Sequence, residues 1–332
     1  MIDRRTALIG ALAGGIATPL PAQTLAPFTP ASRHLAFPDP RETIDLWPGG
    51  APAAPKALPV ETVVERSEDA AFNDRIVSGI AVPRMAMFRP ARPNGMAALI
   101  TPGGGYGRVV LDKEGYELGR WLAERGITAF VLFYRLPHEG WTSGPATPLA
   151  DAQRAMRLIR HRASAYGLDP ARIAAIGFSA GGHVCADLLT RFAHPAYPPR
   201  DAADRLSARP DAAAPIYPVV SMSAPHAHQG SRSNLLGASP TPALEAAHSP
   251  HLNVPANAPP CFLVHAEDDS SVAVENSLLL RGALRARGIA TETHLYPDGG
   301  HGFGLRGAKG KAVEGWQDNL LAWMMRSLAP PA

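Results

Sequence analysis

The chain lacks the features that mark disulfide-stabilised and nucleic-acid-binding proteins. It has only two cysteines, Cys185 and Cys261, and each lies within an apolar stretch, which favours two buried free thiols over a disulfide bridge. No metal site can be built on two such thiols. Lysines and arginines are scattered and the formal net charge is only +3, so the basic stripe that a phosphate backbone requires is missing. We therefore expect no nucleic acid among the partners.

A membrane-spanning run is also missing near the start of the chain, because the apolar stretch from Ala7 to about Leu20 is too short to cross a bilayer comfortably. Arg4 and Arg5 precede this stretch and a Pro-Ala-Gln sequence follows it, which is typical of a cleavable export signal. We expect residues 1–22 to be that signal and the mature protein to be periplasmic or secreted, without membrane contact. The paired arginines favour the twin-arginine route, with an ordinary Sec signal as the alternative.

The rest of the chain has an ordinary globular composition, with 46% hydrophobic and 18% charged residues, enough to bury a sheet on both faces. Residues 23–58 are rich in proline and alanine and show no periodicity, which predicts an extended arm on the domain surface. The main domain is expected at residues 59–332, because α/β folds often exceed two hundred residues as one unit.

Strand-like and helix-like patterns alternate along this domain. The expected strands are Val60–Arg66, Ile80–Phe88, Ala97–Thr101, Thr128–Arg135, Arg172–Phe178, Ala214–Ser221, Cys261–His265 and Thr291–Tyr296. The expected helices are Lys113–Arg125, Leu149–Ala165, Ala180–Phe192, Val274–Arg287 and Lys311–Ser327. Short, continuously apolar strands separated by helices predict a doubly wound, mostly parallel α/β sheet with helices on both faces and a ligand site beyond the carboxyl ends of the strands. Two stretches, 193–209 and 224–259, look like insertions over that edge, where substrate selection usually resides.

A G-x-S-x-G motif, Gly177-Phe178-Ser179-Ala180-Gly181, lies between a buried strand and a helix. The serine of such a motif lies on a turn so sharp that side chains two positions away on either side would collide, so glycine is needed there. The following helix points free N–H groups and the positive end of its dipole at any oxyanion beside the serine. We predict Ser179 as a nucleophile; the alternative is a flexible turn.

A glycine-rich loop, Pro102–Gly107, follows the expected strand at 97–101. Its three consecutive glycines let the backbone approach a ligand without an intervening Cβ. We predict an oxyanion hole formed by the backbone N–H of Gly104 or Gly105 together with that of Ala180. A phosphate cradle is the alternative, but no G-K-[ST] sequence follows and no dinucleotide spacing fits.

Two later strands end in residues that complete a catalytic triad. One ends in Asp268 and Asp269, and the other ends in His301, which three glycines flank. The order serine, aspartate, histidine is that of α/β-hydrolase enzymes. The imidazole takes the Ser179 proton and returns it to the leaving group, while a buried carboxylate holds its tautomer. His301 is the predicted base; the acid is one of the two aspartates, whose alternative role is capping of the next helix.

The other histidines are weaker candidates. His265 competes with His301 as the base, but its strand position indicates a core histidine. The histidines of the second insertion have a spacing that suggests metal ligands, although we expect surface residues instead: His226, His228, His248 and His251. We expect neither a metal nor another cofactor.

Further short motifs run through the chain between about Val60 and Leu328: Pro102–Tyr106, Asp112–Gly115, Tyr134–Leu136, Asp151–Ala155, Gly177–His183, Tyr217–Val219, Gly230–Arg232, Leu235–Gly237 and Gly300–Gly304. Together they resemble the α/β-hydrolase family of bacterial acetylxylan-esterase-like (BD-FAE-type) proteins. The D-x-x-V spacing from Asp269 to Val272 resembles that of related enzymes and favours Asp269 over Asp268. Ala273 departs from the family pattern, in which proline is common, without touching the chemistry.

The resemblance implies a serine esterase that cleaves short acyl esters of small molecules or polysaccharides, often acetyl groups on plant polysaccharides, through an acyl-enzyme. We name Tyr106 and Glu114 as candidate substrate-binding residues, and Tyr134 and Arg135 as further candidates for the mouth of the site. Two other functions remain open. One is a serine peptidase of the prolyl-oligopeptidase type, which usually needs a gating domain, and the other is a catalytically silent binding module, which would lack triad residues.

Overall fold

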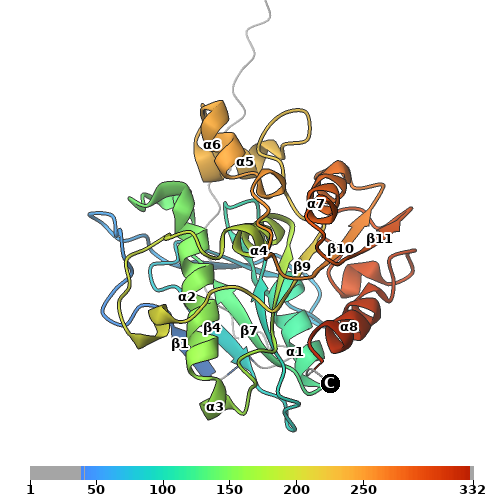
Figure 1. Cartoon of the computed structure of the whole chain (residues 1–332), viewed down its shortest axis with the longest axis horizontal. Helices are drawn as coiled ribbons and strands as arrows, with labels where there is room; N and C mark the ends of the chain where they lie inside the picture. The colour runs from blue at the N-terminus through green and yellow to red at the C-terminus, as the bar shows by residue number, and fades with distance from the viewer. Residues whose placement is uncertain (1–38, 41, 330–332) are drawn as a thin grey trace, which may run out of the picture. The chain divides into compact units, whose positions relative to one another are not determined.

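A sheet of eight strands forms the centre of the molecule (Figure 1). In the order in which they lie side by side, the strands are β1 (Glu42–Asp45), β4 (Arg84–Phe88), β7 (Thr128–Phe133), β5 (Ala97–Thr101), β8 (Ile173–Phe178), β9 (Ala212–Ile216), β10 (Cys261–Ala266) and β11 (Thr291–Tyr296). Strand β4 is antiparallel to both of its neighbours, and every other pair is parallel. The expected mostly parallel sheet is confirmed.

The computed structural model describes residues 39–40 and 42–329. The expected export signal at residues 1–22 lies outside these residues, as do residues 23–38 of the expected arm.

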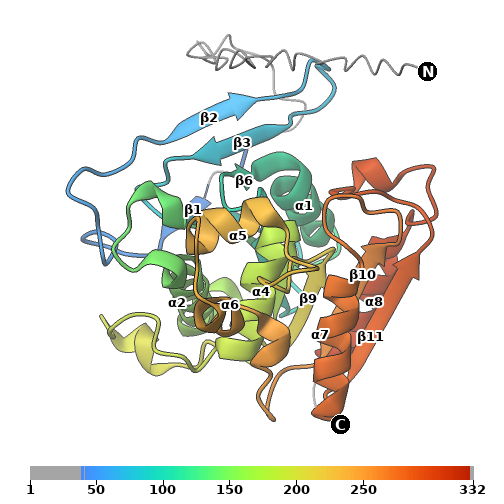
Figure 2. The same cartoon turned by 90° about the horizontal axis from the view of Figure 1, so that it is seen from above.

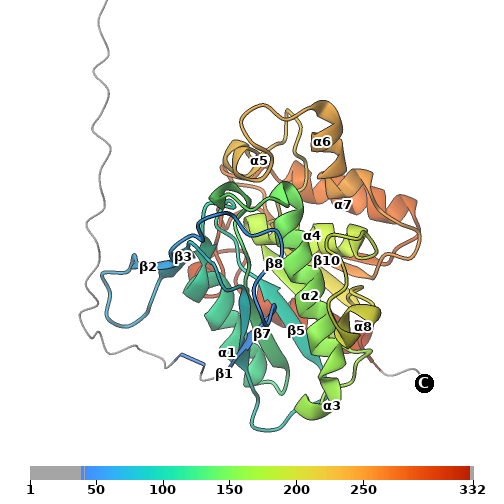
Figure 3. The same cartoon turned by 90° about the vertical axis from the view of Figure 1, so that its left-hand side faces the viewer.

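Helices cover both faces of the sheet, which explains why β5, β7, β8, β9 and β10 are buried at every position. The helices are α1 (Glu117–Ala123), α2 (Thr147–His161), α3 (Ala163–Tyr166), α4 (Ser179–Arg191), α5 (Gln229–Leu236), α6 (Pro242–Ala247), α7 (Glu275–Ala286) and α8 (Trp316–Ser327). Short 3₁₀ turns lie at Pro137–Glu139, Gly144–Ala146, Ala202–Arg205, Pro250–Leu252 and Arg306–Ala308. In Figure 3, α1 and α2 lie on opposite sides of β5 and β7.

The helix expected at 113–125 begins differently from a regular α-helix. A π-helical turn, Asp112–Tyr116, precedes α1. Such turns are rare and often occur at functional sites. Here the turn carries Lys113 and Glu114 toward the site described below.

Three strands form a second, smaller sheet: β2 (Thr62–Glu65), β3 (Arg75–Ser78) and β6 (Val109–Val110). The strand expected at 60–66 therefore does not join the main sheet, and β3 and β6 were not expected. Figure 2 shows the β2–β3 hairpin beside the main sheet. Arg75 fixes it there, because its backbone N–H and its Nε both donate to Asp112 Oδ2, at 2.7 and 2.9 Å.

The described part of the expected surface arm belongs to the domain instead. Residues 42–45 form edge strand β1, and Trp47 is buried with its indole N–H 2.7 Å from Asp151 Oδ1. Arg154 Nε also donates to the Leu46 carbonyl at 2.9 Å. The domain therefore begins before residue 59, because it already includes β1. A four-residue strand is too short to give a detectable period, and its partner β4 lies about forty residues further along the chain.

The ion pair between Asp151 and Arg135 is fully buried, with Arg135 Nη2 2.8 Å from Asp151 Oδ1. Removing one charge of a buried pair leaves the other uncompensated. We expect Asp151→Asn to lower the free energy of unfolding by about 3–5 kcal/mol, measured by urea denaturation.

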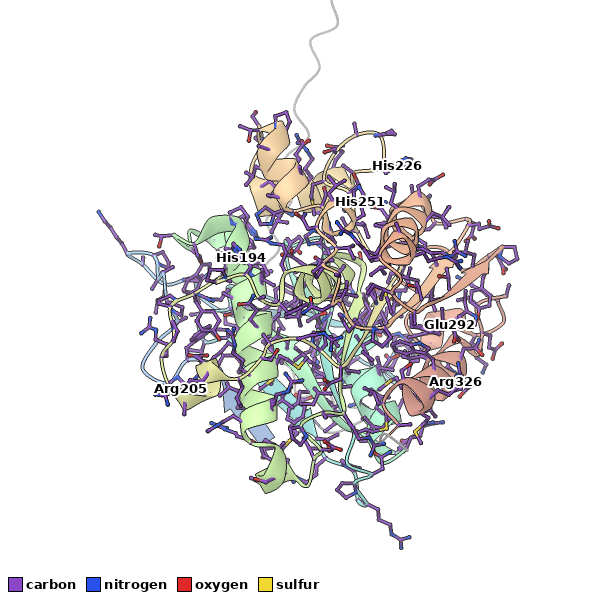
Figure 4. All side chains as sticks on the ribbon, in the orientation of Figure 1. His194, Arg205, His226, His251, Glu292 and Arg326 are labelled. Atoms are coloured by element: carbon purple, nitrogen blue, oxygen red, sulfur yellow. The ribbon has the colours of Figure 1, made fainter. Side chains whose placement is uncertain are left out.

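The matched control for that variant is the exposed pair Glu292–Arg326, which joins β11 to α8 (Figure 4). Arg326→Gln should lower the free energy of unfolding by less than about 1 kcal/mol, because solvent screens exposed ion pairs. If the two variants lost equal free energy of unfolding, Asp151 would not be holding the N-terminal segment against the core.

The second insertion folds into α5 and α6, which lie together at one end of the domain (Figures 1 and 3). Among the described residues, no helix combines the length and the apolar character needed to span a bilayer.

Candidate active site

Ser179 is the first residue of α4 and follows β8 directly. Its φ of +53° is in the left-handed region, where a side chain rarely lies without a reason. A Cβ on Gly177 would come within 2.2 Å of the Gly181 carbonyl oxygen, and a Cβ on Gly181 within 2.1 Å of the Thr101 carbonyl oxygen. Both flanking glycines are therefore required sterically, as the motif predicts.

A chain of hydrogen bonds runs from Ser179 through His301 to Asp269. Ser179 Oγ lies 2.8 Å from His301 Nε2, and His301 Nδ1 lies 2.6 Å from Asp269 Oδ2. Asp269 follows β10 and His301 follows β11. Because β8 to β11 are parallel neighbours, their carboxyl ends meet at one edge of the sheet and bring the three residues together.

The Asp269 carboxylate accepts hydrogen bonds on both oxygens. Oδ1 accepts the backbone N–H groups of Ser271 and Val272 at 2.9 Å each, and Oδ2 also lies 3.2 Å from His265 Nε2. Burial alone would raise the pKa of the Asp269 carboxyl, but the hydrogen bonds from His265 and His301 outweigh it and hold that pKa well below its ordinary value. A negatively charged carboxylate in this position stabilises the imidazolium that forms at His301.

Asp268, the other candidate acid, has a different contact. Its exposed carboxylate accepts the backbone N–H of Gly300 at 2.7 Å, which lowers the pKa of Asp268. Lys311 Nζ donates to the Gly299 carbonyl at 2.8 Å in the same loop. Asp268 therefore holds the loop that carries His301, while Asp269 contacts the ring.

The core position expected for His265 is confirmed, because its ring is fully buried. Its Nδ1 lies 2.8 Å from Ser277 Oγ and its Nε2 lies 2.9 Å from the Val272 carbonyl oxygen. The carbonyl can only accept, so Nε2 carries the proton. His265 thus supports Asp269 from behind, a contact that the strand pattern alone did not reveal.

The glycine-rich loop passes close to Ser179. A Cβ on Gly103 would come within 2.9 Å of Ser179 Cβ. The Gly103 N–H already donates to Glu114 Oε2 at 2.8 Å, whereas the N–H groups of Gly104 and Gly105 donate to no residue that the structure describes. These two groups, and the N–H of Ala180 in the first turn of α4, remain as candidate oxyanion donors.

Glu114 joins the glycine-rich loop to the loop that carries His301. Its Oε2 accepts from Gly103 and its Oε1 accepts from the Tyr217 hydroxyl at 3.0 Å, while that hydroxyl accepts the N–H of Gly304 at 3.2 Å. Burial raises the pKa of Glu114, and the nearby His301 is the largest effect that opposes the rise. Both oxygens of Glu114 are thus occupied, so this candidate substrate-binding residue serves to position the two loops, although it also borders the cavity.

We expect Glu114→Gln to lower kcat for 4-nitrophenyl acetate by roughly ten- to a hundredfold with little change in KM, because small displacements of oxyanion donors weaken transition-state binding selectively. Steady-state kinetics would measure both constants. The control is Glu124→Gln, which changes an exposed carboxylate at the end of α1. If the variant raised KM without lowering kcat, Glu114 would instead be a substrate-binding residue.

A cavity of about 360 Å³ opens in front of Ser179 and His301. Its other lining residues come mainly from the glycine-rich loop, the π-helical turn, the hairpin and the second insertion: Arg66, Gly104, Gly105, Gly107, Arg108, Val110, Lys113, Glu114, His228, Gly230, Asn234, Ser271 and Gly302. The side chain of Ala180, the residue after Ser179, is buried, so Ala180 can take part in the site only through its backbone N–H.

Tyr106 is not a substrate contact, contrary to the expectation from sequence. Its φ of +60° turns the side chain into the core, where it is buried and its hydroxyl lies 2.6 Å from His183 Nδ1. Tyr134 and Arg135 are also buried, with the Tyr134 hydroxyl donating to the Pro102 carbonyl at 2.9 Å. Tyr134 thus supports the glycine-rich loop, whereas Arg135 bonds to Asp151 and to the Pro52 carbonyl; neither borders the cavity.

The histidines of the second insertion do not act as one group. His228 borders the cavity and caps α5 through the N–H of Ser231, whereas His248 lies 3.3 Å from Arg191 Nη1. Figure 4 shows His226 and His251 on the insertion, away from His194. Within the described ranges, no three histidine, cysteine or acidic side chains are grouped to hold a metal ion. His228 was expected at the surface; only the folding of the insertion brings it to the site.

The BD-FAE family model matches residues 99–284, which is more than half of the chain and includes Ser179 and Asp269. The chain belongs to the BD-FAE family. The family resemblance that the sequence motifs indicate is therefore confirmed.

Two curated relatives of this BD-FAE chain come from bacteria. Over 218 residues it is 38% identical to endo-1,4-beta-xylanase B of Butyrivibrio fibrisolvens, a match that covers 66% of the chain and 34% of that protein. Over 226 residues it is 33% identical to acetylxylan esterase of Xylanibacter ruminicola, covering 67% of the chain and 44% of that protein. The chain thus spans less than half the length of each relative.

Solved structures share the fold of this BD-FAE chain. The acetyl ester-xyloside bifunctional hydrolase from Caldicellulosiruptor lactoaceticus is 34% identical with a TM-score of 0.69, and the match covers 87% of this chain and 97% of that one. An esterase from Thermogutta terrifontis, 23% identical with a TM-score of 0.58, has the same fold over 85% of this chain and 97% of that one. The expected α/β-hydrolase fold is confirmed.

Proposed function

We propose that the chain is a serine carboxylic-ester hydrolase that removes short acyl groups, above all acetyl groups on carbohydrate. The observation that carries the proposal is the hydrogen-bond chain from Ser179 Oγ to His301 and on to Asp269, with contacts of 2.8 and 2.6 Å beside an open cavity. The relatives named acetylxylan esterase and acetyl ester-xyloside hydrolase support acetylated carbohydrate as the substrate class.

In the proposed mechanism, Ser179 Oγ attacks the ester carbonyl while His301 Nε2 takes its proton. Asp269 stabilises the imidazolium, and the oxyanion accepts hydrogen bonds from Ala180 and from Gly104 or Gly105. His301 then donates its proton to the departing alcohol, which leaves an acyl-enzyme. Water activated by the same imidazole releases the acid and restores Ser179. Each step uses groups of the chain and water, so the mechanism calls for no cofactor.

We also propose that the protein is exported. The proposal rests on the paired arginines Arg4 and Arg5 and the short apolar run that follows them. A polymeric substrate outside the cell would agree with it. Expression with and without residues 1–22, followed by cell fractionation, would test this directly.

A panel of 4-nitrophenyl esters tests the proposed activity. The cavity of about 360 Å³ is bordered by charged and polar groups, so we expect acetate to be cleaved at least about tenfold more efficiently than octanoate, because a long apolar chain would have to remain partly in water. Release of acetate from acetylated xylo-oligosaccharides should accompany this. The value to compare is kcat/KM for each substrate.

The two other candidate functions give different results in the same assay. A peptidase would cleave the matched 4-nitroanilide measurably, whereas we expect no measurable anilide turnover. A silent binding module would neither cleave esters nor react with a fluorophosphonate probe. Either result would overturn the proposed esterase activity.

A further inference from the structure

The cavity in front of Ser179 has an unbalanced set of charges. Three cationic side chains border it, Arg66, Arg108 and Lys113, against one carboxylate, Glu114. That carboxylate is buried and both of its oxygens are already bonded to Gly103 and Tyr217, as described above. Among the described residues it forms no ion pair with these cations, and although its charge acts on Lys113, one carboxylate cannot balance three cations.

Two of the three cations have no partner among the residues that the structure describes. Arg66 is paired with Asp74 at 2.9 Å. Arg108 and Lys113, by contrast, form neither an ion pair nor a side-chain hydrogen bond with any residue in the described part of the chain. Other half-buried arginines of this protein, such as Arg75 and Arg306, are matched by carboxylates.

The two unpaired cations flank the groups that would handle the ester. Arg108 lies against the glycine-rich loop, because a Cβ on Gly104 would come within 2.2 Å of the Arg108 carbonyl oxygen. Lys113 packs beside Gly304 and Gly307, in the segment that follows His301. Both residues also line the cavity, so positive charge borders the space between the oxyanion donors and His301.

Lys113 is the more informative of the two, because it is half-buried while Arg108 is exposed. Burial lowers the pKa of Lys113, and the charges of Glu114 and Asp74 oppose this only in part. An ammonium that has lost part of its hydration without gaining a partner is unfavourable by itself. A negatively charged ligand group beside it would offset that cost.

We propose that the site takes acyl esters whose substrate also bears a carboxylate, which Lys113 and Arg108 bind while Ser179 attacks the ester. This inference rests on the proposed esterase function and narrows its substrate class. The carboxylate can belong to the alcohol part, as in an acetylated uronic-acid unit of a polysaccharide, or to the acyl part, as in a dicarboxylic acid half-ester. Both sources present the same chemistry to the two cations.

Two substrate pairs distinguish these sources. The acyl pair is mono-4-nitrophenyl succinate and neutral 4-nitrophenyl pentanoate, which have acyl chains of similar length. The alcohol pair is an acetylated methyl glucuronoside and its uronamide, in which an amide replaces the carboxylate, with acetate release as the readout. We expect the parent enzyme to favour the anionic member of at least one pair by about tenfold in kcat/KM.

Charge variants show whether the two cations cause that preference. Lys113→Gln should lower kcat/KM for the anionic substrate by about tenfold and Arg108→Gln by about threefold, because exposed charges are screened more strongly. Turnover of the neutral partner should stay within about twofold. Lys113→Arg keeps the charge and should retain the preference, and the control Arg285→Gln removes an exposed cation of α7 outside the cavity.

The outcomes separate this inference from the proposed function. A preference in the acyl pair alone places the carboxylate on the acyl group, and a preference in the alcohol pair alone places it on the sugar; either supports the inference. The inference would be overturned if the parent enzyme showed no preference in either pair, or if the variants lost kcat/KM equally for charged and neutral substrates. Either result would leave the proposed esterase activity intact. If the parent enzyme cleaved neither the anionic nor the neutral esters, the proposed function itself would fail.

Discussion

Replacing Ser179 with alanine is expected to lower the turnover of 4-nitrophenyl acetate by more than about a thousandfold. The Ser179 hydroxyl is the group that forms the acyl-enzyme, and without it the imidazole and the oxyanion donors can give only weak catalysis of hydrolysis by water. Labelling by a fluorophosphonate probe should disappear in the same variant.

The control for this variant is Ser164→Ala, which removes an exposed hydroxyl on α3. It should retain parental activity and labelling. If Ser179→Ala kept more than about a thousandth of parental turnover with an unchanged circular dichroism spectrum, the nucleophile would have to be sought elsewhere.

The second large effect is expected at Asp269. Asp269→Asn should lower kcat by about ten-thousandfold, because an amide in place of the carboxylate no longer stabilises the imidazolium and favours the wrong tautomer of His301. Protein stability should change much less than kcat, since Asn keeps the shape and an oxygen that can accept the N–H groups of Ser271 and Val272.

Asp268→Asn is the matched comparison, because it makes the same chemical change one residue earlier. Asp268 accepts the Gly300 N–H, whereas the His301 ring bonds to Asp269, and an Asn oxygen at 268 can still accept the Gly300 bond. We expect less than about a tenfold loss of kcat. A larger loss at 268 than at 269 would reverse the assignment of the acid.

Sequence patterns located the central elements well where the local signal and the tertiary environment agree. Strands β5 and β11 have the expected bounds, and β8 differs by one residue. Strands β5 and β8 are almost wholly apolar, and β11 has threonine at alternate positions, Thr291 and Thr293. The expected helix at 311–327 begins instead at Trp316, because Gly315 adopts a left-handed φ of +85° that interrupts a helix.

Sequence patterns do not predict elements whose formation depends on distant partners. Strands β1, β3 and β6 have only two to four residues each, and their pairing is decided by contacts with segments far along the chain. Tyr106 was expected in the site because it belongs to the glycine-rich loop. A left-handed backbone at that residue turns its ring into the core, and no periodic pattern carries that information.

The sequence by itself determined the chemistry that this protein can carry: a serine between two obligatory glycines, a glycine-rich loop, and acidic and histidine residues at the ends of later strands, in the order of the α/β-hydrolase fold. These are properties of local sterics and of strand order. Tertiary structure showed that Asp269, which the D-x-x-V resemblance favours, contacts His301 while Asp268 contacts Gly300. It alone decided that Glu114 links two loops and that two cations without a partner among the described residues line the cavity. Successive residues at a strand end point in different directions, and the groups that distinguish the two aspartates lie about thirty residues further along the chain.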